Sequence, residues 1–374
     1  MTLFILSIIL VYAYTLLILF ALRGWLRKDN SGENEHSFPF CSVVIAARNE
    51  SHNIENTISS LLSQRYPAEC FEILVIDDHS TDNTLELLKQ REQQHENLRI
   101  FSAPDDCIGK KQSLRHVLQF AKGDLILFTD ADCTMNENWI ESYVAFANKH
   151  KGNLYFGNVI PQIDSTSSWI EKCVALDFIG ILSVQNGLAN SRHAFSCNGA
   201  NLCITKSFYK NAYETNESFA SGDDVFLLHT AKRIDKDSVF FISDSNAAIK
   251  TMVPTTLKEF FSQRIRWASK AGGYKDFTAI LVALIVYIYC MAMTICAVGA
   301  CLGYIQLFIV FSLLFVSKLC IDLILFIATA KHYESQKYIW LALPFECVFF
   351  LYITIIPIFS AFKTTKWKER QLKK

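Results

Sequence analysis

Apolar residues dominate the two ends of the chain, and shorter apolar runs alternate with polar ones between them. Residues 3–22 form a nearly uncharged apolar run of the length that crosses a bilayer as a helix. Three further stretches of spanning length follow residue 276, at about 278–301, 304–330 and 338–362. The pattern predicts one membrane span before the middle region and two to three spans after it.

The middle region reads as strands alternating with helices. Short apolar runs predict buried strands at 42–46, 73–76, 98–101 and 125–128. Helical spacing marks the stretches that lie between them, at 53–64, 82–95, 110–121 and 137–149. This alternation predicts an α/β fold with a mainly parallel sheet and helices on both faces. In such sheets ligands bind beyond the carboxyl ends of the strands, so chemistry is expected in the residues just after each strand.

The same pattern divides the chain into four parts. These are an N-terminal anchor at 1–26, an α/β domain at 38–250, an amphipathic helix at 251–276, and a C-terminal membrane region with a basic tail at 277–374. Residues 29–39 are polar and turn-rich, which is typical of a short linker.

Basic residues set the expected orientation in the membrane. Arg23, Arg27 and Lys28 follow the first apolar run and none precede it, which fits a retained anchor better than a cleaved signal peptide. The positive-inside rule then places the α/β domain in the cytoplasm, on a plasma (inner) membrane protein. Three C-terminal spans would leave the basic tail outside, against that rule. A re-entrant or interfacial segment at 338–362 is one resolution, and the sequence does not decide it.

Composition excludes some classes of function. The formal net charge is zero, so no electrostatic case for nucleic-acid binding exists. The 12 cysteines show no CxxC pair and no zinc-type spacing with histidine, which indicates reduced thiols rather than disulfides or a zinc site.

Polar clusters follow three of the predicted strands. They are Ala47-Arg48-Asn49-Glu50, Asp77 to Thr84 (DDHSTDNT) and Thr129-Asp130-Ala131-Asp132-Cys133. A turn with helix N-caps explains any one of them, but three together predict a common site. Asp130 and Asp132 form a D-x-D pair that can share Mg²⁺ or Mn²⁺, since these ions prefer carboxylate and phosphate oxygens.

Two further segments carry candidate chemistry, each with a plainer alternative. Lys110 follows Gly109 at the start of a predicted helix, where a cation and free N–H groups can bind an anion or simply form a solvated turn. Asp223 and Asp224 precede another helix, where a carboxylate can act as a general base or as an N-cap.

The amphipathic segment 254–276 begins with a capping-box pattern at Thr256 and Glu259. Its apolar residues lie on one stripe, with Gln263, Arg264, Arg266 and Lys270 elsewhere on the helix; the stripe is Leu257, Phe260, Phe261, Ile265 and Ala268. A helix lying in the membrane surface, with basic residues at lipid headgroups, explains this pattern without any catalytic role.

Taken in order, these segments resemble the membrane-bound inverting family 2 glycosyltransferases with the GT-A fold, a Rossmann-like nucleotide-sugar-binding domain. The matching pieces span about residues 40–270 and are SVVIAARNE, EILVIDDHSTDNT, GKK, LILFTDADC, FSCNGANL, SGDDV and QRIRW. The Q-x-x-R-W motif resembles that of ceramide glucosyltransferases and of hyaluronan, cellulose and poly-N-acetylglucosamine synthases. The segment at 195–199 (FSCNG) departs from the FFCGS of those synthases.

The resemblance implies a role for each matched position. Donor binding is implied for Arg48, Glu50, Asp78, Lys110, Asp130 and Ala131, and metal binding for Asp130 and Asp132. Asp224 looks like the general base, and Gln263, Arg266 and Trp267 match the motif that holds the diphosphate and shapes the acceptor pocket. The acceptor side is implied for Cys197, Asn198, Gly199 and Asp223.

The implied reaction moves a sugar from a nucleotide-sugar, expected to be a UDP-sugar, to a membrane lipid or lipid-linked glycan with inversion. A processive polysaccharide synthase that uses an oligomer or an export partner stays an alternative, and a nucleotide-sugar-binding scaffold is a weaker one. The apolar stretch 168–190 fits either an interfacial helix near the acceptor or a buried core helix.

Two ionisable residues lie within the C-terminal apolar segments. Asp322 follows Lys318 by four residues, which predicts an ion pair, whereas Glu346 shows no evident partner and is a weak candidate for touching a lipid headgroup.

Overall fold

The computed structural model describes residues 1–27, 37–212, 223–362, 366–367 and 370–371. Its contacts divide the chain into two units. The sheet unit combines residues 28–162, 196–252 and 366–374, and the helical unit combines 1–27, 163–195 and 253–365. The predicted continuous domain at 38–250 differs from this division, because residues 163–195 belong to the helical unit.

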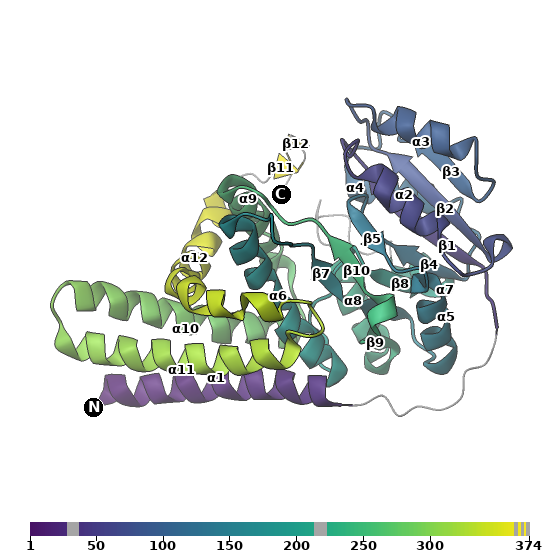
Figure 1. The fold of residues 1–374 in the computed structure, drawn as a ribbon. Helices are drawn as coiled ribbons and strands as arrows, with labels where there is room; N and C mark the ends of the chain where they lie inside the picture. The colour runs from purple at the N-terminus through teal and green to yellow at the C-terminus, as the bar shows by residue number, and fades with distance from the viewer. Residues whose placement is uncertain (28–36, 213–222, 363–365, 368–369, 372–374) are drawn as a thin grey trace. The chain divides into compact units, whose positions relative to one another are not determined.

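A seven-stranded sheet organises the sheet unit, in the order β3-β2-β1-β4-β8-β6-β9 (Figure 1). Its strands are β1 (Cys41–Ala47), β2 (Phe71–Asp77), β3 (Leu98–Ser102), β4 (Leu125–Phe128), β6 (Leu154–Gly157), β8 (Leu202–Thr205) and β9 (Val239–Ile242). The first four are parallel, β8 runs antiparallel to both β4 and β6, and β6 is parallel to β9. The predicted strands and the mainly parallel sheet are confirmed.

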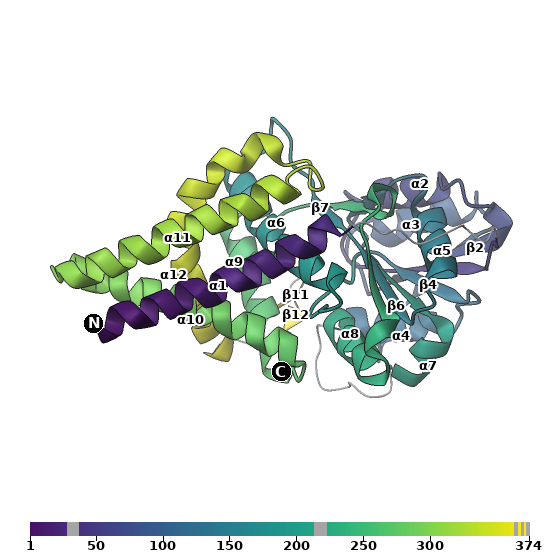
Figure 2. The ribbon, with the colours of Figure 1, turned by 90° about the horizontal axis from the view of Figure 1, so that it is seen from below.

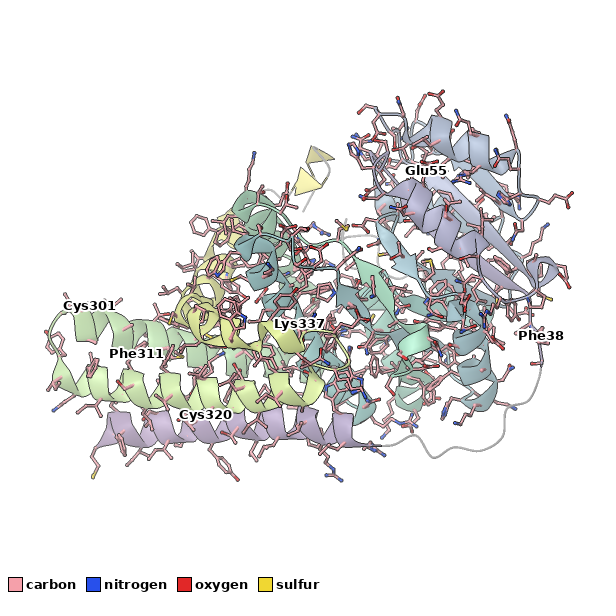
Figure 3. The ribbon with its side chains drawn as sticks, viewed as in Figure 1. Phe38, Glu55, Cys301, Phe311, Cys320 and Lys337 are labelled. Atoms are coloured by element: carbon pink, nitrogen blue, oxygen red, sulfur yellow. The ribbon has the colours of Figure 1, made fainter. Side chains whose placement is uncertain are left out.

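Helices connect these strands. Those that helical spacing predicted are α2 (Ile54–Leu62), α3 (Thr84–Glu92), α4 (Lys110–Leu118), α5 (Trp139–Lys149) and α8 (Asp223–Ile234), and a further helix, α7 (Lys206–Ala212), was not predicted. Helix α2 is typical: Ile54, Ile58 and Leu61 are buried, whereas Glu55 stands on its outer surface (Figure 3). Short 3-10 turns lie at Ala68–Cys70, Lys236–Ser238 and Ser245–Ala247.

Two small sheets complete this unit. One joins β5 (Cys133–Met135), β10 (Ile249–Thr251) and β7 (Val159–Pro161), and the other pairs β11 (Lys366–Trp367) with β12 (Arg370–Gln371). Strand β5 begins one residue after Asp132, so its pairing with β10 fixes the backbone that follows the D-x-D pair.

The order of the large sheet reverses at β1. The chain passes from β1 to β2 and β3 on one side and then returns to place β4 on the other side of β1. Open α/β sheets bind ligands beyond the strand ends at such a reversal. The residues that follow β1, β2 and β4 are therefore the place to seek a site.

The helical unit contains α1 (Thr2–Leu26), α6 (Trp169–Asn190), α9 (Leu257–Ala268), α10 (Phe277–Cys301), α11 (Ile305–Thr329) and α12 (Ala342–Phe362), with 3-10 turns at Ala271–Gly273 and Gln336–Leu341. Helices α1, α10 and α11 lie side by side in both views (Figures 1 and 2). Phe311 of α11 contacts Phe350 of α12, with ring centroids 5.7 Å apart (Figure 3). Helix α12 continues through Pro357.

Within the described ranges, five helical segments are long and apolar enough to cross a membrane: α1, α6, α10, α11 and Gln336–Ser360. Helix α6 cannot be a single crossing, because β6 before it and β8 after it pair in one sheet. Its apolar stretch is 72% buried, against 17% for α1. It approaches α1 at Gly24 and Gly187, where a Cβ on either residue would collide with the other helix's backbone. Of the two explanations for residues 168–190, the buried helix is correct.

A buried charge cluster joins three helices of this unit. Lys318 of α11 lies 2.5 Å from Asp322, as its i, i+4 spacing predicted, and Tyr14 of α1 donates to the other oxygen of Asp322 at 2.7 Å. Lys318 also lies 2.8 Å from Glu346 of α12. The prediction that Glu346 has no partner is wrong, because a partner 28 residues away on another helix cannot be recognised from local spacing.

Candidate active site

The loops after β1 and β2 interlock through backbone and side-chain hydrogen bonds. Asn49 adopts a left-handed φ of 51°, which Asn tolerates, and its side-chain oxygen accepts from the Thr81 N–H at 2.8 Å. The Asn49 N–H in turn donates to Ser80 Oγ at 3.0 Å. Asp82 accepts from Ser51 and Thr84, and these bonds outweigh the effect of partial burial and lower its pKa to about 2.

Arg48 and Asp78 stand at the centre of these loops. Arg48 is buried and donates to the carbonyl oxygens of Asp78 at 2.5 Å and His79 at 2.7 Å. The Asp78 carboxylate is fully buried and lies 3.1 Å from His79 Nδ1. It also accepts from the N–H of Gly109, the residue that caps α4, at 3.4 Å. Asp78 thus links the loop after β2 to the start of α4.

Lys110, the first residue of α4, forms an ion pair with Asp130 at the end of β4. Burial alone would lower the pKa of Lys110, but attraction to Asp130 and, more weakly, to Asp224 and Asp132 raises it above its ordinary value of 10.5. One ammonium group therefore lies within the field of three carboxylates that come from distant parts of the sequence. Lys110, Asp130, Asp132 and Asp224 thus interact electrostatically, and the roles expected for them in donor binding, metal binding and catalysis stay predictions.

Buried groups contact the D-x-D segment and fix its backbone. The Ala131 carbonyl accepts from Thr57 Oγ1 at 2.8 Å, and Cys133 is fully buried with its sulfur 3.5 Å from Asp132 Oδ1. Burial, then the charges of Asp132 and Asp130, raise the pKa of the Cys133 thiol well above its ordinary range. Cys133 is therefore a neutral packing group and not a nucleophile.

Asp224 is oriented by the segment at 197–199. Its carboxylate accepts from the Gly199 N–H at 2.9 Å and from the Val225 N–H at 2.9 Å, and its carbonyl accepts from Cys197 Sγ at 3.2 Å. Asn198 caps the same turn by accepting from the Ala200 N–H at 3.0 Å. Asp223 begins α8, but its side chain lies outside the described residues, as do Ser221 and Gly222.

Asn201, which the sequence analysis did not single out, anchors that segment. Its side-chain oxygen accepts from Trp139 at 2.9 Å and Tyr143 at 2.8 Å, and its nitrogen donates to the carbonyls of Asn158 at 2.7 Å and Ala247 at 2.8 Å. A buried amide with all four bonds made fixes its backbone firmly. The only sequence signal was its place in the FSCNGAN stretch.

The QRIRW residues belong to the other unit. Gln263, Arg266 and Trp267 lie on α9 of the helical unit, whereas the cluster around Lys110 belongs to the sheet unit. Arg264 of α9 is buried and so is Lys270 just after the helix, whereas Leu257 and Phe261 of the apolar stripe are exposed. Arg264 is buried because it pairs with Asp177 of α6. Of the capping box, the Thr256 side chain accepts from the Glu259 N–H as expected.

Comparison with known families identifies the chain. The description "Glycosyl transferase family 2" matches residues 42–197, and "Glycosyl transferase family group 2" matches residues 125–359, more than half of the sequence. The chain is a family 2 glycosyltransferase. The matched ranges include the D-x-D pair, Asp224 and the QRIRW motif.

Named relatives of this glycosyltransferase act in different settings. Glycosyltransferase AglE of Haloferax volcanii is 32% identical over 33% of this chain and 40% of its own length. A beta-monoglucosyldiacylglycerol synthase of a Nostoc species is 26% identical over 66% and 51%. A poly-beta-1,6-N-acetyl-D-glucosamine synthase of Staphylococcus epidermidis is 26% identical over 63% and 54%. The glycosyltransferase thus spans about half the length of these relatives, or less.

Among solved structures, mannosyltransferase PcManGT from Pyrobaculum calidifontis, in complex with GDP-Man and Mn²⁺, superposes with a TM-score of 0.60. The alignment covers 95% of this glycosyltransferase and 99% of that chain at 16% identity. The alignment extends over residues of both units, and the predicted GT-A fold is confirmed.

Carboxylates are the candidate ligands for a metal ion in this site. No group of three or more His, Cys, Asp or Glu residues gathers there as a ready-made metal cage. Asp130 and Asp132 supply two carboxylates, and the Lys110 ammonium already neutralises one of them. Mg²⁺ and Mn²⁺ are commonly held by one or two carboxylates plus substrate phosphates, so this pair fits such an ion with a bound nucleotide.

Proposed function

We propose that this glycosyltransferase transfers a single sugar from a UDP-sugar to the hydroxyl of a membrane lipid. The convergence of Lys110, Asp130, Asp132 and Asp224 at the reversal point of the sheet carries the proposal. A cation among carboxylates suits a site that must bind a charged diphosphate and also accept a proton from a hydroxyl.

The donor occupies the loops after β1, β2 and β4. Arg48 and Asp78 form a fixed surface against which the nucleotide binds, because both are buried and Arg48 donates a hydrogen bond to the Asp78 carbonyl oxygen. Lys110 lies at the N-terminus of α4, where an ammonium and free N–H groups attract phosphate oxygens. Asp130 and Asp132 would hold Mg²⁺ or Mn²⁺, which supplies positive charge against the leaving diphosphate.

Asp224 takes the acceptor proton. Two N–H groups hold its carboxylate, one from Gly199 and one from Val225. A positioned base of this kind lowers the barrier for attack of a hydroxyl on the anomeric carbon. The hydroxyl oxygen bonds to the sugar, the sugar–phosphate bond breaks, and the proton stays on Asp224. One displacement of this kind inverts the configuration at the anomeric carbon.

The acceptor is a lipid because the same chain carries apolar helices of spanning length. A catalytic unit that such helices hold at a bilayer encounters lipid hydroxyls at high effective concentration. The Nostoc relative's name, beta-monoglucosyldiacylglycerol synthase, is in line with this choice. The Staphylococcus relative's name favours a polysaccharide product, and a polysaccharide synthase acting with a partner is the second candidate.

Charge supports an orientation in the membrane. Arg23 lies in the last turn of α1 and Arg27 caps it, which by the positive-inside rule favours a sheet unit in the cytoplasm, at the inner membrane. Nucleotide-sugars are then available directly from the cytoplasmic pool. Whether residues 338–362 cross the bilayer or return within it stays a prediction.

The test is a donor screen with the purified protein in native lipid extract containing Mg²⁺ or Mn²⁺. Release of nucleoside diphosphate is measured for each donor, and products are sized by mass spectrometry. One lipid heavier by a single sugar supports the proposal. A ladder of sugar products supports the synthase instead, and the absence of any release with every donor contradicts both.

A further inference from the structure

Helix α9 carries a buried cation that the proposed mechanism does not use. Arg264 is 5% exposed, and Asp177 of α6, which it faces, is 1% exposed. Arg264 Nε donates to Asp177 Oδ2 at 2.7 Å, and Nη2 forms an ion pair with the same oxygen. The pair therefore joins two helices of the helical unit that are 87 residues apart in sequence.

Asp177 also reaches a third helix. The Tyr352 hydroxyl of α12 donates to Asp177 Oδ1, so each carboxylate oxygen has a partner on a different helix. The Phe260 ring of α9 packs against the Tyr352 ring, with centroids 5.5 Å apart. One carboxylate thus sets the position of α9 against both α6 and α12.

Arg264 contacts two residues of the QRIRW motif directly. Its Nη1 donates to Gln263 Oε1 at 3.0 Å, and its guanidinium carbon lies 4.2 Å from the centroid of a Trp267 ring. A guanidinium has only donors, so the Gln263 atom that faces it must be the oxygen, and the amide NH₂ points away. Trp267 is bounded on another side by Phe178, whose ring centroid is 5.8 Å away.

We propose that Arg264 and Asp177 are positioning residues, which orient Gln263 and Trp267 for their roles at the diphosphate and the acceptor. This inference rests on the proposed function. Asp177 fixes the direction of the guanidinium, the guanidinium fixes the amide of Gln263, and the same planar group stacks on Trp267. Lysine in place of Arg264 keeps the charge but has neither the planar face nor the donor fork.

A purely structural role predicts something different. Apolar side chains would join α6 and α9 at least as well as a buried ion pair, which is costly to desolvate. The pair is useful at this place because it presents a fixed donor and a flat cation to two neighbouring motif residues. Positioning therefore requires that the effect of changing Arg264 pass through Gln263 and Trp267.

The first test is a double-mutant cycle on transfer rate. Arg264→Lys is expected to lower kcat about 10- to 100-fold in the wild-type background and by a clearly smaller factor when Gln263→Ala is already present, because only the path through Trp267 then remains. Thr329→Val is the matched control, since it removes a buried hydrogen bond between α11 and α6, 2.9 Å long, without touching α9. Its kcat should stay near the wild-type value.

The second test needs no turnover. The protein has six tryptophans, so 5-fluorotryptophan labelling gives a small set of fluorine resonances, and Trp267→Phe assigns the one of interest. Arg264→Lys and Asp177→Asn should both shift or broaden the Trp267 resonance, and Thr329→Val should leave it in place.

The outcomes separate the two proposals. A wild-type protein that transfers no sugar overturns the proposed function, and the fluorine spectrum alone then decides whether Arg264 orients Trp267. An unmoved Trp267 resonance overturns the positioning role. In an active enzyme, equal kcat losses from Arg264→Lys with and without Gln263→Ala also overturn it, because those effects would be independent.

Discussion

Gly199→Ala tests the placement of the proposed base with the addition of one methyl group. A Cβ at residue 199 would lie 3.2 Å from Asp224 Cβ and 3.4 Å from its Oδ2. The first distance is shorter than ordinary van der Waals contact, so Asp224 must move by a few tenths of an ångström. The N–H of residue 199 also donates to Asp224 at 2.9 Å, and that bond is stretched by the same movement.

The expected loss is moderate. A hydrogen bond to a charged group contributes about 1.5–3 kcal/mol, and a bond that is stretched but not removed should lose about half of this. A loss of about 1.4 kcal/mol in the transition state lowers kcat about 10-fold. Donor binding should change less than about 2-fold, since the Gly199 N–H donates to Asp224 and not to a residue proposed to bind the donor.

The assay compares kcat and donor KM of Gly199→Ala with those of the wild type and of Gly272→Ala. The control adds the same methyl group where no atom lies within 4 Å of the new Cβ. A wild-type kcat in Gly199→Ala, or a loss confined to KM, would refute the placement of Asp224 as base.

Three further outcomes are expected. Lys318→Met leaves the buried Asp322 and Glu346 without their cation and should lower the free energy of unfolding by ~3–5 kcal/mol, measured as a large fall in melting temperature in detergent. Replacing all three residues with apolar ones should restore stability. An unchanged melting temperature in Lys318→Met would contradict the buried charge cluster. Burial raises the pKa of Cys133, so iodoacetamide at about pH 8 should label Cys133 only after denaturation. Labelling of Cys133 in the native protein would contradict its burial beneath Asp132. Burial lowers the pKa of Lys110, but attraction to Asp130 outweighs it and raises that pKa above 10.5, so Lys110 stays charged and its contribution is lost only as the pH rises through the raised pKa. The transfer rate should therefore show no fall due to Lys110 up to about pH 9. A fall in rate below that pH that Lys110→Met abolishes would contradict this expectation.

The sheet and much of the site could be predicted because local pattern determines them. Strands such as β1 and β4 are buried on both faces and read as short apolar runs, and the polar residues that follow them, Asp130 and Asp132 included, meet at one edge by topology alone. Lys110 begins α4 and Asp224 is the second residue of α8, and both lie in the same electrostatic cluster.

Pairings between distant segments could not be predicted. Arg264 looked like a surface residue of α9 because its partner Asp177 is far away in sequence. Glu346 looked unpaired for the same reason. Helix α6 interrupts the sheet unit, yet its spacing and composition are those of any apolar helix, so only the pairing of β6 with β8 shows that the chain returns to the same sheet after it.

In the proposed function, Asp224 takes the proton of the acceptor hydroxyl as one sugar is transferred to a lipid. The most direct measurement is lipid mass spectrometry of reactions run with wild type and Asp224→Asn, beside UDP-sugar binding to both proteins. We expect a lipid heavier by one sugar with wild type, no such product with Asp224→Asn, and similar donor binding for the two. Transfer by Asp224→Asn at the wild-type rate would contradict the proposal.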